Sequence, residues 1–110
     1  TIQENINIFD ELIGLAKEIN KNIKIIILLT PRLAEVEKAH SENKKMVRWK
    51  HEFEEIIQPY VSGNICYLNM KNLYPISENA YFYEDAGHMN AVGANAYTSY
   101  LNDFILNWES

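Results

Sequence analysis

The sequence predicts an α/β fold in which helices cover both faces of a parallel sheet. Two apolar segments, residues 23–30 and 65–70, lack the alternation of a half-exposed strand and are expected to be strands buried on both faces. Segments with helical periodicity precede, separate and follow them. This order matches part of a doubly wound, three-layer α/β/α sheet, and two strands alone would leave both sheet edges open.

The first helix is predicted over residues 2–20, where a polar turn at Asn20 ends it. Its apolar residues recur at helical spacing and predict a broad buried face: Ile2, Ile6, Ile8, Phe9, Leu12, Ile13, Leu15, Ala16 and Ile19. The strand that follows is expected to end at Thr30, because Pro31 lacks the N–H that a further ladder bond would need.

Between the strands, the charged residues 34–40 predict a loop with at most one helical turn. Ser41 is expected to cap a second long helix that runs to about Gln58, before Pro59. The apolar residues of this helix lie three or four positions apart: Met46, Trp49, Phe53, Ile56, Ile57 and Tyr60. The turn at 62–64 then leads into the second strand.

After the second strand, residues 71–88 have no helical period and are expected to form a long loop of functional importance. Asn90 is predicted to cap the last helix, which extends to about Trp108. Eight residues of this helix are expected to face inward: Val92, Ala96, Tyr97, Tyr100, Leu101, Phe104, Ile105 and Trp108. Gly93 is expected to let this helix approach the sheet closely.

Composition limits the classes of function. A chain of 110 residues forms one domain, 1–110, and 47% hydrophobic with 23% charged residues is typical of a globular protein. The net charge of −5 argues against nucleic acid or an anionic membrane as the main ligand. The single cysteine, Cys66, excludes an intrachain disulfide and is interpreted as a buried core thiol.

The chemically most informative segment is the loop that opens the last helix. Asp85 lies three residues before His88, a spacing at which a carboxylate can contact one imidazole nitrogen and leave the other free. This is the orienting half of a nucleophilic triad, in which the carboxylate fixes the tautomer and His acts as general base. Glu84 is the rival carboxylate and the second choice.

The extended motif Asp85-x-x-His88-x-Asn90-x-x-Gly93-Ala94 resembles the last conserved block of the SGNH (GDSL-type) hydrolase and acyltransferase superfamily. The likeness is greatest to its DltD-like, membrane-anchored branch and related O-acyltransfer proteins. It implies that Asp85 and His88 are triad members and that the fold is flavodoxin-like. The Gly-Asp-Ser nucleophile block, the oxyanion Gly and the Gly-x-Asn block of the family have no match in this sequence.

The resemblance implies that residues 1–110 are the C-terminal half of a larger SGNH-like domain, a serine esterase or acyltransferase acting on O-acyl groups, for example of a cell-wall polysaccharide. The parent protein would then be extracytoplasmic or membrane-anchored. The expected partners are the missing N-terminal half of the domain or a second copy of the chain, as in a homo-oligomer. The alternative is a non-catalytic α/β protein-interaction module, which the absent nucleophile favours.

Other candidate residues are weaker. None of the five serines lies in a nucleophile-elbow motif, and only Ser77, on the long loop, could approach His88. His51-Glu52-x-x-Glu55 resembles a zinc signature that lacks its second His, so neither a metal nor an organic cofactor is expected. His40 has no partner nearby in the sequence and is expected to be exposed.

Overall fold

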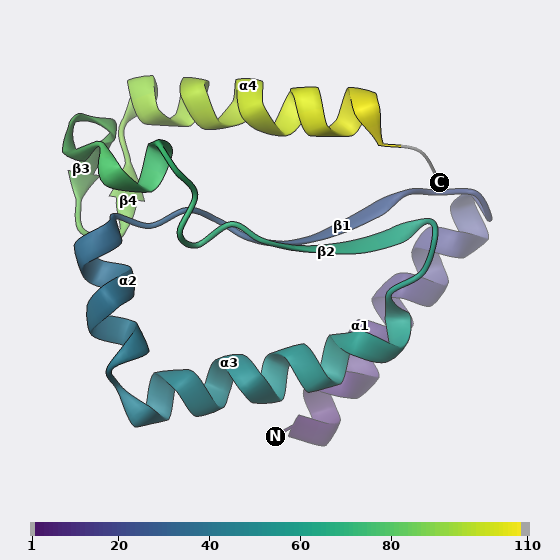
Figure 1. Ribbon diagram of the computed structural model, residues 1–110. Helices are drawn as coiled ribbons and strands as arrows, with labels where there is room; N and C mark the ends of the chain where they lie inside the picture. The colour runs from purple at the N-terminus through teal and green to yellow at the C-terminus, as the bar shows by residue number, and fades with distance from the viewer. Residues whose placement is uncertain (1, 109–110) are drawn as a thin grey trace.

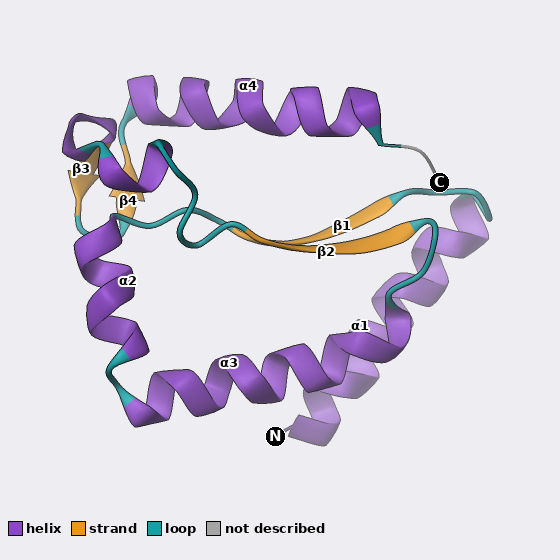
Figure 2. Cartoon of the chain, viewed as in Figure 1, coloured by secondary structure: helices purple, strands orange, loops and turns teal. Residues whose placement is uncertain are grey.

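A computed structural model describes residues 2–108 and has a mixed α/β fold built around a two-stranded parallel sheet. The larger elements are α1 (Ile2–Ile19), β1 (Ile25–Leu29), α2 (Ala34–Ser41), α3 (Lys44–Ile57), β2 (Ile65–Asn69) and α4 (Ala91–Asn107). Short elements lie between these: the 3₁₀ helices η1 (Gln58–Tyr60), η2 (Ile76–Glu78) and η3 (Ala80–Phe82), and the antiparallel pair β3 (Tyr83–Asp85) and β4 (His88–Met89). Figure 2 shows how helix predominates over strand in the chain.

Strands β1 and β2 pair in parallel, with Ile27 opposite Tyr67 and Leu28 opposite Leu68. The connection between them passes through α2 and α3, as a parallel pair requires. Figure 1 shows α4 on one side of the sheet and α1 with α3 on the other. The predicted α/β class, with two parallel strands between helices, is therefore confirmed, and within residues 2–108 neither strand pairs with a third.

Alternating strand residues contribute to two separate cores, as the two-residue period of a strand dictates. The α1/α3 core contains the buried residues Ile13, Ile27, Ile57 and Ile65, and Tyr67 packs against it. The α4 core lies on the other side and contains Met70, Ile76 and Tyr97, with Leu28 and Leu68 packed against it. Cys66 is only partly buried, although burial still raises the pKa of its thiol.

The broad buried face predicted for the first helix is wrong. Ile13 is the one buried residue of α1, whereas Ile8, Leu12, Leu15 and Ile19 are 64%, 60%, 52% and 84% exposed. The sheet is only two strands wide, so the α1/α3 core reaches one side of this helix. We call these four residues the α1 stripe. None of the helices in residues 2–108 is both long and apolar enough to cross a membrane.

The last helix has a smaller inward face than predicted for the same reason. Tyr97 is buried and Leu101 packs beside it, but Val92, Tyr100 and Ile105 are exposed. At its C-terminal end, the carbonyl of Trp108 accepts a hydrogen bond of 3.0 Å from Lys24 Nζ, just before β1. This contact joins the C-terminal end of α4 to the segment that leads into β1.

The prediction for residues 34–43 is also wrong. The charged segment forms the two-turn helix α2, with glutamates in its first turn and Lys38 in its last, which suits the helix dipole. Ser41 ends this helix and donates a hydrogen bond to the Lys38 carbonyl. Asn43 caps α3 instead, because its side-chain oxygen accepts from the N–H groups of Lys45 (3.0 Å) and Met46 (3.2 Å).

The long segment 71–88 is more ordered than a plain loop. It contains η2, η3 and most of the β3–β4 hairpin, which ends at Met89, and none of these follows from a segment without helical period. The buried Ile76 and Ser77 fix η2 against α4 and the end of β2. The hairpin is consequently held beside the start of α4 (Figure 1).

Gly93 allows α4 to pack directly against η3. A β-carbon at this position would lie 2.1 Å from the carbonyl oxygen of Phe82 and 2.7 Å from its Cβ. The close approach expected at Gly93 is present, but the segment approached is the end of η3 and not the parallel sheet. A side chain of any size would separate α4 from the segment that leads into the hairpin.

Replacement of Gly93 by alanine is expected to lower the free energy of unfolding by about 1–3 kcal/mol, because the backbone of Phe82 cannot move away as a side chain could. Gly14→Ala in α1 is the matched control, since a β-carbon at Gly14 would have no neighbouring atom within 4 Å. This control is expected to gain about 0.5–1 kcal/mol from its higher helix propensity. Chemical denaturation of both variants measures the difference; equal stabilities would contradict the tight packing at Gly93.

Candidate functional site

The β3–β4 hairpin brings Asp85 and His88 together. Asp85 is the last residue of β3 and His88 the first of β4, and only residues 86–87 separate them. Nδ1 of His88 lies 2.8 Å from Oδ1 of Asp85 and 3.0 Å from Oδ2. The carboxylate is therefore in contact with one imidazole nitrogen, and Glu84 has no such contact with His88 among the described residues.

A second hydrogen bond holds the carboxylate in place. The backbone N–H of Gly87 donates to Oδ1 of Asp85 over 2.8 Å, inside the turn. This N–H, followed by the hydrogen bond from His88, lowers the pKa of the Asp85 carboxyl below its ordinary value. Asp85 is accordingly ionised at neutral pH and accepts both hydrogen bonds.

The contact assigns the tautomer of His88. Because Nδ1 faces an ionised carboxylate, it carries a proton, which leaves Nε2 of the neutral ring as a proton acceptor. Within residues 2–108, Nε2 makes no hydrogen bond. The side chains of His88 and Asp85 are 77% and 62% exposed, so the free nitrogen is accessible from outside the chain.

Asn90 attaches the hairpin to the neighbouring elements. Its side-chain oxygen accepts from the N–H of Gly93 over 2.9 Å, which confirms its predicted role as the cap of α4. Its side-chain N–H donates to the carbonyl of Tyr81, and its backbone N–H donates to the carbonyl of Phe82 over 2.8 Å. One residue thus links η3, the hairpin and α4 two positions after His88.

The serines of this chain do not complete a triad. Ser77 is fully buried, and its hydroxyl accepts from the N–H of Leu73 (2.8 Å) and donates to the carbonyl of Lys71 (3.2 Å). In the described part of the chain, no serine hydroxyl contacts Asp85 or His88, and Ser110 lies outside that part. Ser77 is a structural residue of the loop.

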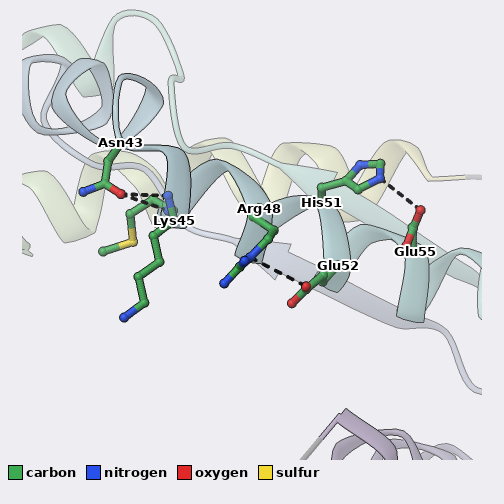
Figure 3. Close-up of polar contacts among 7 residues, drawn as sticks. Asn43, Lys45, Arg48, His51, Glu52 and Glu55 are labelled. Carbon is green, nitrogen blue, oxygen red and sulfur yellow. Dashed lines mark hydrogen bonds and ion pairs between the residues drawn. The ribbon is translucent and has the colours of Figure 1, made fainter.

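The zinc-like segment of α3 forms polar contacts along the helix surface (Figure 3). Nε2 of His51 lies 3.0 Å from Oε1 of Glu55, while Glu52 lies 3.9 Å from Arg48 Nε. The two pairs engage the three candidate ligands separately and do not direct them to a common point. Across residues 2–108, no group of three or more His, Cys, Asp or Glu side chains is arranged to hold a metal ion.

The expectation for His40 is wrong, and it points to a region that the sequence did not single out. His40 is partly buried, and its Nδ1 lies 3.2 Å from Nη1 of Arg32. Both residues line a cavity between the carboxyl ends of the strands and the helices α2 and α3. The contact between Arg32 and His40 could not be predicted from the sequence, because it depends on the formation of α2 between them.

Comparison with protein-family models, with curated protein sequences and with solved structures found no match. Three features of the chain itself bear on its function: a parallel α/β unit, an oriented Asp85–His88 pair and a cavity at the carboxyl ends of the strands.

The pKa of Asp85 offers a direct check of the pair. A lowered pKa in the folded chain means that Asp85 stabilises the fold above its unfolded value of about 3.9 and that this contribution is lost as pH falls through the lower folded pKa. His88→Ala is expected to raise the pKa of Asp85 while leaving it below the ordinary value, because the Gly87 N–H remains. Carboxyl NMR titration of both proteins measures the shift; an unchanged pKa would contradict the contact.

Proposed function

We propose that this chain supplies the Asp and the His of a serine esterase or acyltransferase of SGNH type that acts on O-acyl groups. The observation that carries the proposal is the 2.8 Å contact between Asp85 and Nδ1 of His88, with Nε2 left free. An imidazole oriented in this way can take a proton from a hydroxyl nucleophile. The motif around the pair, through Asn90 and Gly93, adds the resemblance to that superfamily.

In this proposal the nucleophile is a serine from outside residues 1–110. Its oxygen attacks the acyl carbonyl while Nε2 of His88 accepts the hydroxyl proton, and the imidazolium is stabilised by Asp85. Collapse of the tetrahedral intermediate breaks the ester bond, and His88 returns the proton to the leaving alcohol. Water or a second hydroxyl then attacks the acyl-enzyme by the same route, which releases the acid or a new ester and frees the serine.

The architecture supports a place for this chain in a larger three-layer, flavodoxin-like sheet. Helices lie on both sides of β1 and β2, and in residues 2–108 both outer strand edges are unpaired. Further strands at these edges would satisfy the unpaired backbone groups and widen the surface that α1 can cover. The other half of such a domain would contribute the serine and the oxyanion donors.

The proposed substrates are O-acyl or O-acetyl esters on a cell-wall or surface polysaccharide, and the parent protein would be extracytoplasmic or membrane-anchored. These assignments follow from the resemblance alone. The exposed position of His88 is compatible with a large polymeric substrate, since no segment among residues 2–108 covers the imidazole.

A fluorophosphonate probe tests the catalytic proposal in the longest natural form of the protein. An activated serine displaces fluoride from phosphorus, and intact mass reports the adduct. Labelling is expected to disappear in His88→Ala and to slow by on the order of 10⁴-fold in Asp85→Asn, because the tautomer is then no longer fixed. His51→Ala is the matched control, an exposed histidine that also contacts a carboxylate.

The proposal fails if the folded protein does not react, or if His88→Ala reacts at the rate of the unaltered protein. Thermal unfolding of each variant separates loss of chemistry from loss of structure. Since Asp85 and His88 are both exposed, the variants are expected to unfold within a few degrees of the parent.

A non-catalytic interaction module is the second candidate, and the α1 stripe favours it. Ile8, Leu12, Leu15 and Ile19 lie at spacings of four, three and four, so they form one continuous apolar face on the exposed side of α1. An exposed apolar face of this kind is typical of a protein contact. A second copy of this chain is the partner proposed for it.

Sedimentation of the chain over a range of concentrations tests this candidate. The double variant Leu12→Gln/Leu15→Gln is expected to weaken self-association by tenfold or more, because two central residues of the stripe lose their apolar surface. Glu11→Gln/Glu18→Gln changes exposed residues of the same helix and serves as the control. A chain that stays monomeric at high concentration would rule out the second copy as partner.

A further inference from the structure

A cavity lies between α2, α3 and the carboxyl ends of β1 and β2, and neither Asp85 nor His88 lines it. Its volume is about 470 Å³, within the range of small-molecule sites, roughly 300–1,000 Å³. Leu29 of β1, residues of α2 and α3, and Lys71 after β2 line it. Figure 1 shows this corner, where α2 descends from the end of β1 and α3 runs back beneath the sheet.

Three cationic residues line the cavity: Arg32, Lys50 and Lys71. All three are partly buried, and among residues 2–108 none of them is in an ion pair. The backbone N–H of Arg32 donates to the backbone carbonyl of Lys71 over 3.0 Å. This bond holds the two residues side by side where the parallel strands end. This local excess of positive charge stands out in a chain of net charge −5.

Glu37 supplies an acceptor in the same place. Glu37 lines the cavity, and its Oε2 atom is buried and has no hydrogen-bond partner in the described part of the chain. A buried carboxylate oxygen without a donor is costly to the fold. The three cationic side chains outnumber this one carboxylate, so the lining of the cavity keeps an excess of positive charge.

Apart from the polar residues His40 and Ser41, the remaining wall of the cavity is apolar. Trp49, Phe53 and Met46 of α3 line it opposite the strand end at Leu29. Nζ of Lys45 lies over the Trp49 ring, 4.7 Å from its centroid, and Lys50 is the lysine of α3 that lines the cavity. The cavity therefore combines a cationic end with an apolar wall.

We propose that this cavity binds a small amphiphilic anion. A carboxylate or phosphate contacts Arg32, Lys50 and Lys71, and an apolar body lies against Trp49 and Phe53. The position at the carboxyl ends of parallel strands is where open α/β sheets bind their ligands. Neither Asp85 nor His88 lines this cavity, so binding here is independent of their role.

NMR titration of the chain with octanoate, octyl phosphate, octanol and acetate tests the proposal. The indole N–H of Trp49 is expected to shift saturably with octanoate or octyl phosphate, while Trp108, at the end of α4, does not shift. Tighter binding of octanoate indicates a carboxylate ligand, and tighter binding of octyl phosphate indicates a phosphate ligand. Octanol and acetate, which lack the charge or the apolar body, are expected to bind at least tenfold more weakly.

Arg32→Gln/Lys71→Gln is expected to weaken binding by about tenfold or more, because two charge-assisted hydrogen bonds are lost. Lys17→Gln, an exposed residue of α1, is the matched control, and His88→Ala is expected to bind as the parent does. Unfolding midpoints verify that the double variant is folded. Absence of saturable binding by any probe, or equal binding of octanol and octanoate, would overturn the proposal.

Discussion

The contact between α4 and the backbone of Phe82 determines where the Asp85–His88 pair lies. Gly93 brings the helix so close that a β-carbon would overlap the Phe82 carbonyl, and Asn90 hydrogen-bonds on both sides of this junction. The hairpin has only five strand residues and could not hold its own geometry in water. It keeps its position because α4 is in turn anchored by Tyr97 in the α4 core.

The pair itself is arranged by local bonds and not by burial. Gly87 and His88 both donate to one carboxylate within a turn of two residues, so the imidazole is oriented even though both side chains are largely exposed. Water screens charges at such a position, and an exposed pair of this kind contributes little to stability. Full catalytic strength would need a neighbouring surface that excludes water from Nε2, which fits the view of this chain as one part of a larger site.

Sequence patterns identified the elements that depend on local chemistry. The two strands, three of the four helices, the Asn90 cap and the Asp85–His88 contact follow from spacing and residue type. The exposure of the apolar side chains of α1 could not be inferred from spacing, because they outnumber those that a two-stranded sheet can cover. The cavity was equally hidden, since Arg32, Lys50 and Lys71 come together only after α2 and the strands have formed.

The two separate cores allow the chain to unfold locally in two parts. The α1/α3 core and the α4 core share no buried residue, and only the thin layer of β1 and β2 lies between them. Each face can therefore come apart with little loss to the other, so the chain resembles two cooperative units joined through one pair of strands. The amides that bond between β1 and β2 belong to both units and are expected to be the last to exchange with solvent, whereas the hairpin of His88 is expected to open together with α4 alone.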